Sequence, residues 1–321
     1  MANYGYLTSD EVIALQTILN QGVDRYNQED RNWKALFCND TTDMYVRVMQ
    51  RSQSMEEVGE DTSLPAVQTT AYQTITLPAP KRYALRNGVT RAAIDQGVTE
   101  EQVRTDYEEA YLADGRLLIK YCTRAMLLDG GWWDATATPP TWAENSFTSS
   151  HDHYVAVNQS GVPNLANFVT AKRHIQEHGF GLGNSIACFM HGDTVGTIEK
   201  IPEFSTAPGP MPTTYLDALQ RNGLVPGGNI SNVAVFPTDW VPKNYAIFVD
   251  MARKPLHWRN PRGAAANGAL QVYRPDTSDM DWAGKQSIVR WASAKVTLRG
   301  AGLAMYFSGS SWTDPTISLT A

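Results

Sequence analysis

A helical pattern that continues without a break for about 30 residues constrains this chain more than any other feature. Thr99 is a suitable N-cap, and Gln102 completes a capping box three residues later. Apolar residues then recur at helical spacing as far as Leu128, and two glycines after Asp129 end the pattern. A helix over residues 99–129 would be roughly 45 Å long, which is more than a small domain needs. We therefore expect it to brace a larger body.

Bulk properties exclude several classes of protein. The 321 residues suffice for one large domain or two ordinary ones without disulfide support. The formal net charge of −6 argues against a protein that coats nucleic acid through a basic surface, although it allows a shell that encloses DNA. The three cysteines are widely spaced, so we expect reduced, buried thiols. We expect neither a secretory signal nor a membrane contact, because the sequence has no long apolar stretch.

The first 43 residues are polar and irregular, apart from a short amphipathic helix between Ser9 and Leu19. We interpret residues 1–43 as an N-terminal arm that packs on another surface. The arm residues expected to make contacts between subunits are Leu15, Tyr26 and Trp33.

Two strand-like segments, Met44–Met49 and Ala71–Leu77, flank a long polar stretch and predict an extended β-hairpin. An isolated two-stranded ribbon is only marginally stable in water, so the hairpin should lie on a partner surface. Its base, from Lys81 to Gln96, is expected to lead directly into the long helix. The hairpin residues expected to contact a neighbouring subunit are Tyr45, Val48, Glu56, Glu57, Glu60, Asp61, Tyr72 and Ile75.

An α/β unit is predicted in the middle of the chain. Asn164 caps a second amphipathic helix that continues to about His178, and a glycine-rich turn over residues 179–183 stops it. A short apolar strand, Ile186–Met190, and a further helix, Asp193–Ile198, follow. The alternation of helix, strand and helix is typical of α/β packing.

The C-terminal half is rich in predicted strands. Alternation of side chains is clearest over Ile288–Leu298. The other strands predicted there are Val233–Phe236, Tyr245–Asp250, Leu256–Trp258, Leu270–Tyr273 and Leu303–Phe307. A short helix is predicted over Thr214–Arg221, and residues 130–163 are expected to form a polar loop. The order of elements predicts an α+β fold.

Taken in order, the arm, hairpin, long helix, α/β unit and closing strands resemble the major capsid proteins of tailed bacteriophages, the HK97-type family. The likeness is best over residues 99–130, 164–200 and 288–307, and it covers roughly residues 40–310. In that family the hairpin is called the E-loop, the long helix is the spine of the peripheral domain, and the α/β unit is the axial domain.

The resemblance implies a division of the chain into six parts. Residues 1–43 would be the N-terminal arm, and residues 44–96 would be the E-loop and its base. Residues 97–163 would form the peripheral domain around the spine helix, and residues 164–240 would form the axial domain. Peripheral strands would follow over residues 241–300, and residues 301–321 would return to the axial domain and end the chain.

The function that the resemblance implies is structural. Subunits of this kind self-assemble into the pentamers and hexamers of an icosahedral head that encloses double-stranded DNA. The partners would be further copies of the chain, packaged DNA without sequence preference, and portal, scaffold and decoration proteins. The subunits would assemble in the host cytoplasm and remain in the virion. We expect no catalytic residue, no metal and no cofactor.

Two alternatives stay open at the level of sequence. An encapsulin-type compartment has the same fold and would enclose an enzyme in place of DNA. A zinc metallopeptidase is the other, because His174, Glu177 and His178 match the H-x-x-E-H motif, in which two histidines share a zinc ion. We expect this motif to face solvent, away from the apolar face of its helix. His151 and His153 resemble half of a metal site, but they lie in a predicted polar loop with no evident third ligand.

Overall fold

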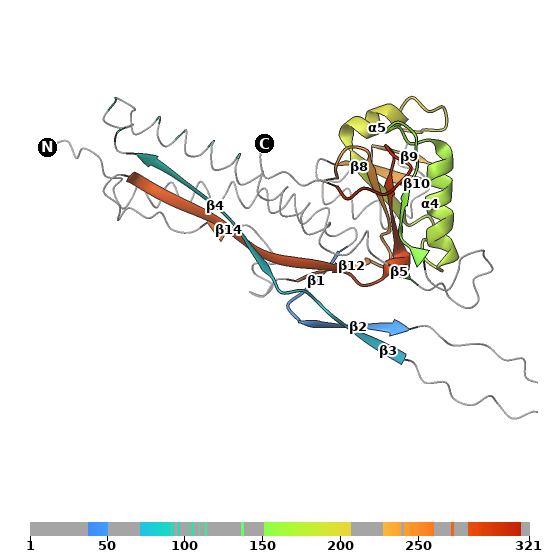
Figure 1. The fold of residues 1–321 in the computed structure, drawn as a ribbon, viewed down its shortest axis with the longest axis horizontal. Helices are drawn as coiled ribbons and strands as arrows, with labels where there is room; N and C mark the ends of the chain where they lie inside the picture. The colour runs from blue at the N-terminus through green and yellow to red at the C-terminus, as the bar shows by residue number, and fades with distance from the viewer. Residues whose placement is uncertain are drawn as a thin grey trace, which may run out of the picture.

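The computed structural model describes residues 38–50, 71–90, 92, 96, 102, 105, 109, 113, 136–137, 151–206, 227–238, 241–259, 271–272 and 282–315. Over these residues the chain forms two main β-sheets, and helices cover one face of the larger sheet (Figure 1). None of the described helices is both long enough and apolar enough to cross a lipid bilayer.

A six-stranded mixed sheet forms the centre of the α/β unit, with the strand order β7-β15-β11-β8-β10-β9. In that order the strands are Tyr154–Ala156, Gly302–Tyr306, Tyr245–Asp250, Ile186–His191, Val233–Thr238 and Gly228–Ile230. β8 runs parallel to β10 and antiparallel to β11, and its residues from Ile186 to Met190 are all buried. Burial on both faces explains why this strand reads as an unbroken apolar run.

Two helices cover one face of this sheet. α4 (Leu165–Glu177) packs on β11 and β15, and α5 (Gly192–Ile198) packs on β8 and β10. Asn164 and Asn167 form a reciprocal capping box that begins α4. The side chains of Phe168 and Ile175 point from α4 into a buried cluster with alternate residues of the strands, so one apolar stripe holds the helix in place.

The opposite face of the six-stranded sheet packs on the second sheet, in which the strand order is β1-β12-β14-β13 and β4 also pairs with β14. The strands of this second sheet are β1 (Cys38–Thr41), β4 (Lys81–Thr90), β12 (Leu256–Arg259), β13 (Gln271–Val272) and β14 (Trp282–Val296). Phe189 and Ile247 share one buried cluster with Leu256 and Trp258, both of which are fully buried. Because side chains of this size each contribute about 1.5–3 kcal/mol when buried, this cluster joins the two sheets firmly.

β14 is the longest strand and takes part in both regions of the second sheet. It pairs antiparallel with β4 from Trp282 opposite Thr90 to Ala292 opposite Lys81, and its last residues pair with β12. Its 15 residues extend about 50 Å at about 3.4 Å each. Figure 1 shows the β4–β14 ribbon reaching away from the α/β unit.

A separate two-stranded hairpin lies beside the end of the second sheet (Figure 1). It consists of β2 (Tyr45–Gln50) and β3 (Ala71–Thr76), which pair antiparallel with Tyr45 opposite Thr76. A further small pair joins β5 (Thr136–Ala137) to β6 (His151–Asp152).

The structure confirms most of the predicted elements within the described residues. The paired hairpin strands, the helices α4 and α5 and the C-terminal strands lie where the sequence predicts them. The largest difference among these is β14, which begins at Trp282 rather than at Ile288.

Two segments expected to be irregular form parallel strands instead. Cys38–Thr41, at the end of the expected arm, is β1 and runs parallel to β12. Tyr154–Ala156, in the expected polar loop, is β7 and runs parallel to β15. Each segment is short and pairs with a strand far away in the sequence, so the local pattern carries no signal of the pairing.

Of the segment expected to lead into the long helix, Lys81–Gln96, the first ten residues form the strand β4, an element that is not among those predicted from the sequence. The burial along β4 alternates. Tyr83 is half-buried and packs on the core cluster, whereas Arg82 and Ala84 on either side of it are exposed. This is the period of two that marks a strand with one buried face.

The predicted long helix lies largely outside the described residues, as does the short helix predicted over Thr214–Arg221. The four positions described within residues 99–129 are Gln102, Thr105, Glu109 and Ala113, and all four are helical and exposed. Their spacing of three or four residues places them on one face of a helix.

The expectation of buried thiols is confirmed for Cys38 and Cys188. Burial raises the pKa of the Cys188 thiol well above its ordinary value, because the thiolate would lose its hydration among apolar side chains.

Truncation of the cluster that joins the two sheets should destabilise the fold strongly. We expect Leu256→Ala to lower the free energy of unfolding by about 2–5 kcal/mol, because it leaves a cavity at a fully buried site. Leu182→Ala is the matched control, because Leu182 is 72% exposed, and it should change stability by less than about 0.5 kcal/mol. Urea unfolding of the unassembled chains, followed by circular dichroism, measures both. Equal effects of the two substitutions would contradict this description of the core.

Candidate functional site

The β2–β3 hairpin is attached to the rest of the chain only at its base within the described residues. The backbone amide of Leu77 donates to the carbonyl of Met44 over 2.9 Å and closes the hairpin, and the side chain of Leu77 is buried. Lys295 Nζ donates to the carbonyl oxygen of Thr76 over 3.0 Å. Ser293 Oγ donates to the carbonyl oxygen of Pro78 over 2.9 Å. These bonds hold the base against β14, while the paired strands lie beyond it.

The hairpin register assigns its residue positions to two faces. Tyr45 and Thr76 lie opposite each other, as do Met49 and Tyr72, so these four positions share one face. The other face carries Val46 opposite Ile75 and Val48 opposite Gln73. Of the expected contact residues, Tyr45 and Tyr72 are therefore on one face, and Val48 and Ile75 are on the other.

Apolar side chains at the hairpin are exposed to solvent. Tyr45 is 56% exposed and the adjacent Met44 is 48% exposed. Exposed apolar side chains of this size beside an unsupported two-stranded ribbon are typical of a surface that another chain covers. The remaining expected contact residues lie outside the described residues, namely Glu56, Glu57, Glu60, Asp61, Leu15, Tyr26 and Trp33.

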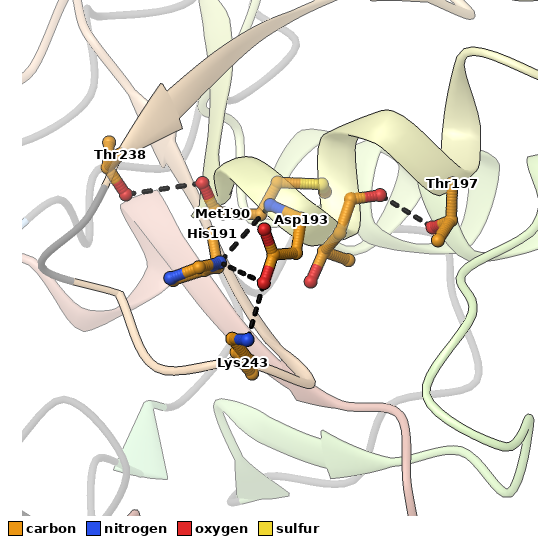
Figure 2. Close-up of polar contacts among 7 residues, drawn as sticks. Met190, His191, Asp193, Thr197, Thr238 and Lys243 are labelled. Carbon is orange, nitrogen blue, oxygen red and sulfur yellow. Dashed lines mark hydrogen bonds and ion pairs between the residues drawn. The ribbon is translucent and has the colours of Figure 1, made fainter.

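A second polar group of residues lies at the start of α5 (Figure 2). His191 Nδ1 accepts a hydrogen bond of 3.2 Å from the amide of Asp193 and so caps the helix. Lys243 Nζ lies 2.5 Å from Asp193 Oδ2. This hydrogen bond and the lysine charge together lower the pKa of the Asp193 carboxyl. The pair is exposed and forms a charged feature on the surface of the α/β unit.

Three histidines meet at the other end of the α/β unit. His174 lies in the last turn of α4, and His178 is the C-cap residue that follows the helix. His153 is the residue directly before β7. The ring centroid of His153 lies 4.7 Å from that of His174 and 4.7 Å from that of His178. The centroids of His174 and His178 lie 5.2 Å apart. One ring nitrogen from each side chain lies within 4.8 Å of the other two.

This cluster corrects two expectations from the sequence. The H-x-x-E-H motif was expected to face solvent, but His178 is only 4% exposed and His174 is half-buried. His153 was expected to lie in a polar loop without a third ligand, but it is 1% exposed and lies against both other histidines. The signal that sequence reasoning missed is the parallel pairing of β7 with β15, which carries His153 to the end of α4.

Glu177 does not join the histidines. Its Oε1 accepts a hydrogen bond of 2.7 Å from Arg173 Nε, one turn earlier on α4. In the H-x-x-E-H peptidases the glutamate acts as the general base beside the metal. Here the ion pair with Arg173 holds this carboxylate instead, so the geometry does not support a peptidase.

Comparison with solved structures identifies the fold. A chain from the structure of Mycobacterium phage Patience is similar over 98% of this chain and 93% of its own length, with a TM-score of 0.64 and 16% identity. The HK97-type fold is confirmed. A chain of the capsid of the cyanophage P-SCSP1u has a TM-score of 0.56 and 9% identity, over 86% of this chain and 87% of its own. A chain of the capsid of an empty GTA particle has a TM-score of 0.52 and 13% identity, over 86% of this chain and 89% of its own.

No protein-family model matches the sequence, and no curated protein matches it either. The HK97-type fold is thus recognised through its arrangement in space, at identities where residue-by-residue similarity has largely disappeared.

The ion pair between Asp193 and Lys243 predicts a measurable change in the titration of the Asp193 carboxyl when Lys243 is removed. The low pKa of Asp193 means that its interaction with Lys243 stabilises the fold at neutral pH and is lost as the pH falls through that lowered pKa. We expect Lys243→Ala to return the pKa of Asp193 toward its ordinary value, as measured by NMR of the carboxyl carbons. Lys172→Ala is the control, because Lys172 donates instead to the carbonyl oxygen of Ser231. An unchanged Asp193 titration in Lys243→Ala would contradict this assignment.

Proposed function

We propose that this protein is the major capsid protein of a tailed bacteriophage, a structural subunit without a catalytic role. The observation that carries the proposal is the HK97-type fold over nearly the whole chain, at 98% coverage for the structure of Mycobacterium phage Patience. The chains compared from the cyanophage P-SCSP1u and the GTA particle belong to capsids, and we infer the same role for this chain.

The projecting elements of the chain support a role in assembly. The β2–β3 hairpin joins neither main sheet within the described residues and carries exposed apolar side chains. A ribbon of this kind gains stability when it lies on another surface. Interfaces between permanently associated subunits bury on the order of 2,000–5,000 Å², which an extended hairpin and arm can supply. We infer that residues 44–96 include the E-loop and that residues 1–43 form the arm that reaches a neighbouring subunit.

We assign the axial domain to the six-stranded sheet with α4 and α5. From the sequence we expect this domain at residues 164–240. The sheet topology supports adding β7, β15 and β11, because β7 pairs with β15, β15 pairs with β11, and β11 pairs with β8. The β4–β14 ribbon and the helix predicted over residues 99–129 would form the peripheral domain. In a closed shell the same subunit occupies five- and sixfold rings through head-to-tail contacts.

The proposed partners follow from this role. The chain would associate chiefly with further copies of itself, in pentamers and hexamers, and with portal, scaffold and decoration proteins. The shell would enclose double-stranded DNA without sequence preference. The formal net charge of −6 suits a subunit that does not bind the DNA phosphates tightly. The subunits would assemble in the host cytoplasm and remain in the virion.

Removal of the hairpin tests the proposal. The amide of Leu77 bonds to the carbonyl of Met44, so a short glycine-serine linker can replace residues 45–76 without straining the base. We expect the variant to fold, with an unchanged circular dichroism spectrum of the core, but to form no closed shells in electron microscopy or light scattering. Tyr45→Phe keeps the exposed ring and is the control that should still assemble.

The contents of the shells complete the test. Particles of uniform size that contain double-stranded DNA support a phage head, whereas particles that contain a protein cargo would indicate a compartment. Shells of wild-type size from the linker variant would contradict the role given to the hairpin.

A further inference from the structure

We propose that His153, His174 and His178 form a binding site for a divalent transition-metal ion, with zinc as the expected ion. The site would link the C-terminal end of α4 to the edge of the six-stranded sheet, because His153 directly precedes the edge strand β7. This inference is independent of the role proposed for the whole chain.

The arrangement of donors suits a three-histidine site. Imidazole nitrogen is a preferred ligand of zinc, copper and nickel, and three protein ligands plus one water are a common zinc set. Zinc–nitrogen bonds of about 2.0–2.1 Å place tetrahedral ligand atoms about 3.3 Å apart. One nitrogen of each ring lies within 4.8 Å of the nitrogens of the other two. Rotation about the soft χ2 angle of histidine covers the remaining difference.

A backbone carbonyl orients the central ring. His153 Nδ1 lies 2.9 Å from the carbonyl oxygen of Gly302, in the first position of β15. A carbonyl oxygen can only accept, so Nδ1 carries the proton and, in the neutral ring, the buried Nε2 keeps its lone pair. Histidines that bind metal usually donate their second nitrogen to a carbonyl or carboxylate in this way, which fixes the tautomer and the ring plane.

The backbone at the end of α4 holds His178 in place. α4 ends in a Schellman motif: the amide of Gly179 donates to the carbonyl of Gln176 over 2.8 Å, and that of Phe180 donates to Ile175 over 3.2 Å. This geometry fixes His178 at the end of the helix.

A glycine gives the His178 side chain room. A Cβ atom at Gly300 would lie 3.1 Å from both Cβ and Cγ of His178, closer than ordinary contact. Gly300 therefore lets the short helix before β15 approach the ring. His174 is half-buried, so the cluster is not wholly enclosed by the fold.

Zinc binding to the full-length chain tests the proposal. We expect calorimetry with zinc chloride, after chelator treatment and dialysis, to show one ion bound per chain, and zinc to raise the melting temperature. His174→Gln should weaken binding by at least about tenfold and remove the rise in melting temperature. This residue is chosen because it is half-buried, so the variant should still fold, as circular dichroism would verify.

A matched histidine provides the control. His191→Asn removes a histidine at the start of α5 but keeps a side chain that can cap the helix, so it should bind zinc like the wild type. Cobalt provides a second readout, because a tetrahedral site with nitrogen ligands gives an intense visible absorption that His153→Gln should abolish. No zinc binding by the wild type, or equal binding by His174→Gln and His191→Asn, would overturn the proposal.

Discussion

The buried contact between the six-stranded sheet and β12 is the interaction on which the rest of this structure depends. Leu256 and Trp258 fill the space between the two sheets, and the neighbouring end of β14 is buried with them at Ala294 and Val296. β14 is one continuous strand, so burial of its C-terminal end in this core also sets the direction of its N-terminal part. That part, together with β4, points away from the α/β unit. The hairpin base is bonded to the same end of β14, so one cluster of apolar side chains orients both projecting elements.

Within the described residues, some parts of the chain are supported by their own chain on every side and others are not. β8 is buried on both faces by side chains of its own chain, and α4 is capped at both ends by its own residues. The β2–β3 hairpin has only its own two strands for support within the described residues, and it exposes Tyr45. Such a division suits a subunit whose core is complete before assembly and whose appendages gain their stability from contacts between subunits.

Local patterns were sufficient to predict much of the fold. The cap at Asn164, the apolar run from Ile186 and the alternation after Ile288 each reflect a force that acts between near neighbours in the sequence, and all three elements are present. The parallel strands β1 and β7 could not be predicted in this way, because their partners are distant in the chain. The same reason explains the error at the histidines: a helical wheel places His174 and His178 correctly at the end of α4, but only the pairing of β7 with β15 brings His153 to cover them.

The position of the hairpin in an assembled particle is the most direct test of the claim that this chain completes its fold on copies of itself. Electron cryomicroscopy of particles formed by the full-length chain would show where the strands Tyr45–Gln50 and Ala71–Thr76 lie. The proposed function predicts closed shells in which each hairpin lies across an adjacent subunit and the exposed ring of Tyr45 is covered there. A chain that stays monomeric, or a hairpin packed entirely against its own subunit, would contradict this claim.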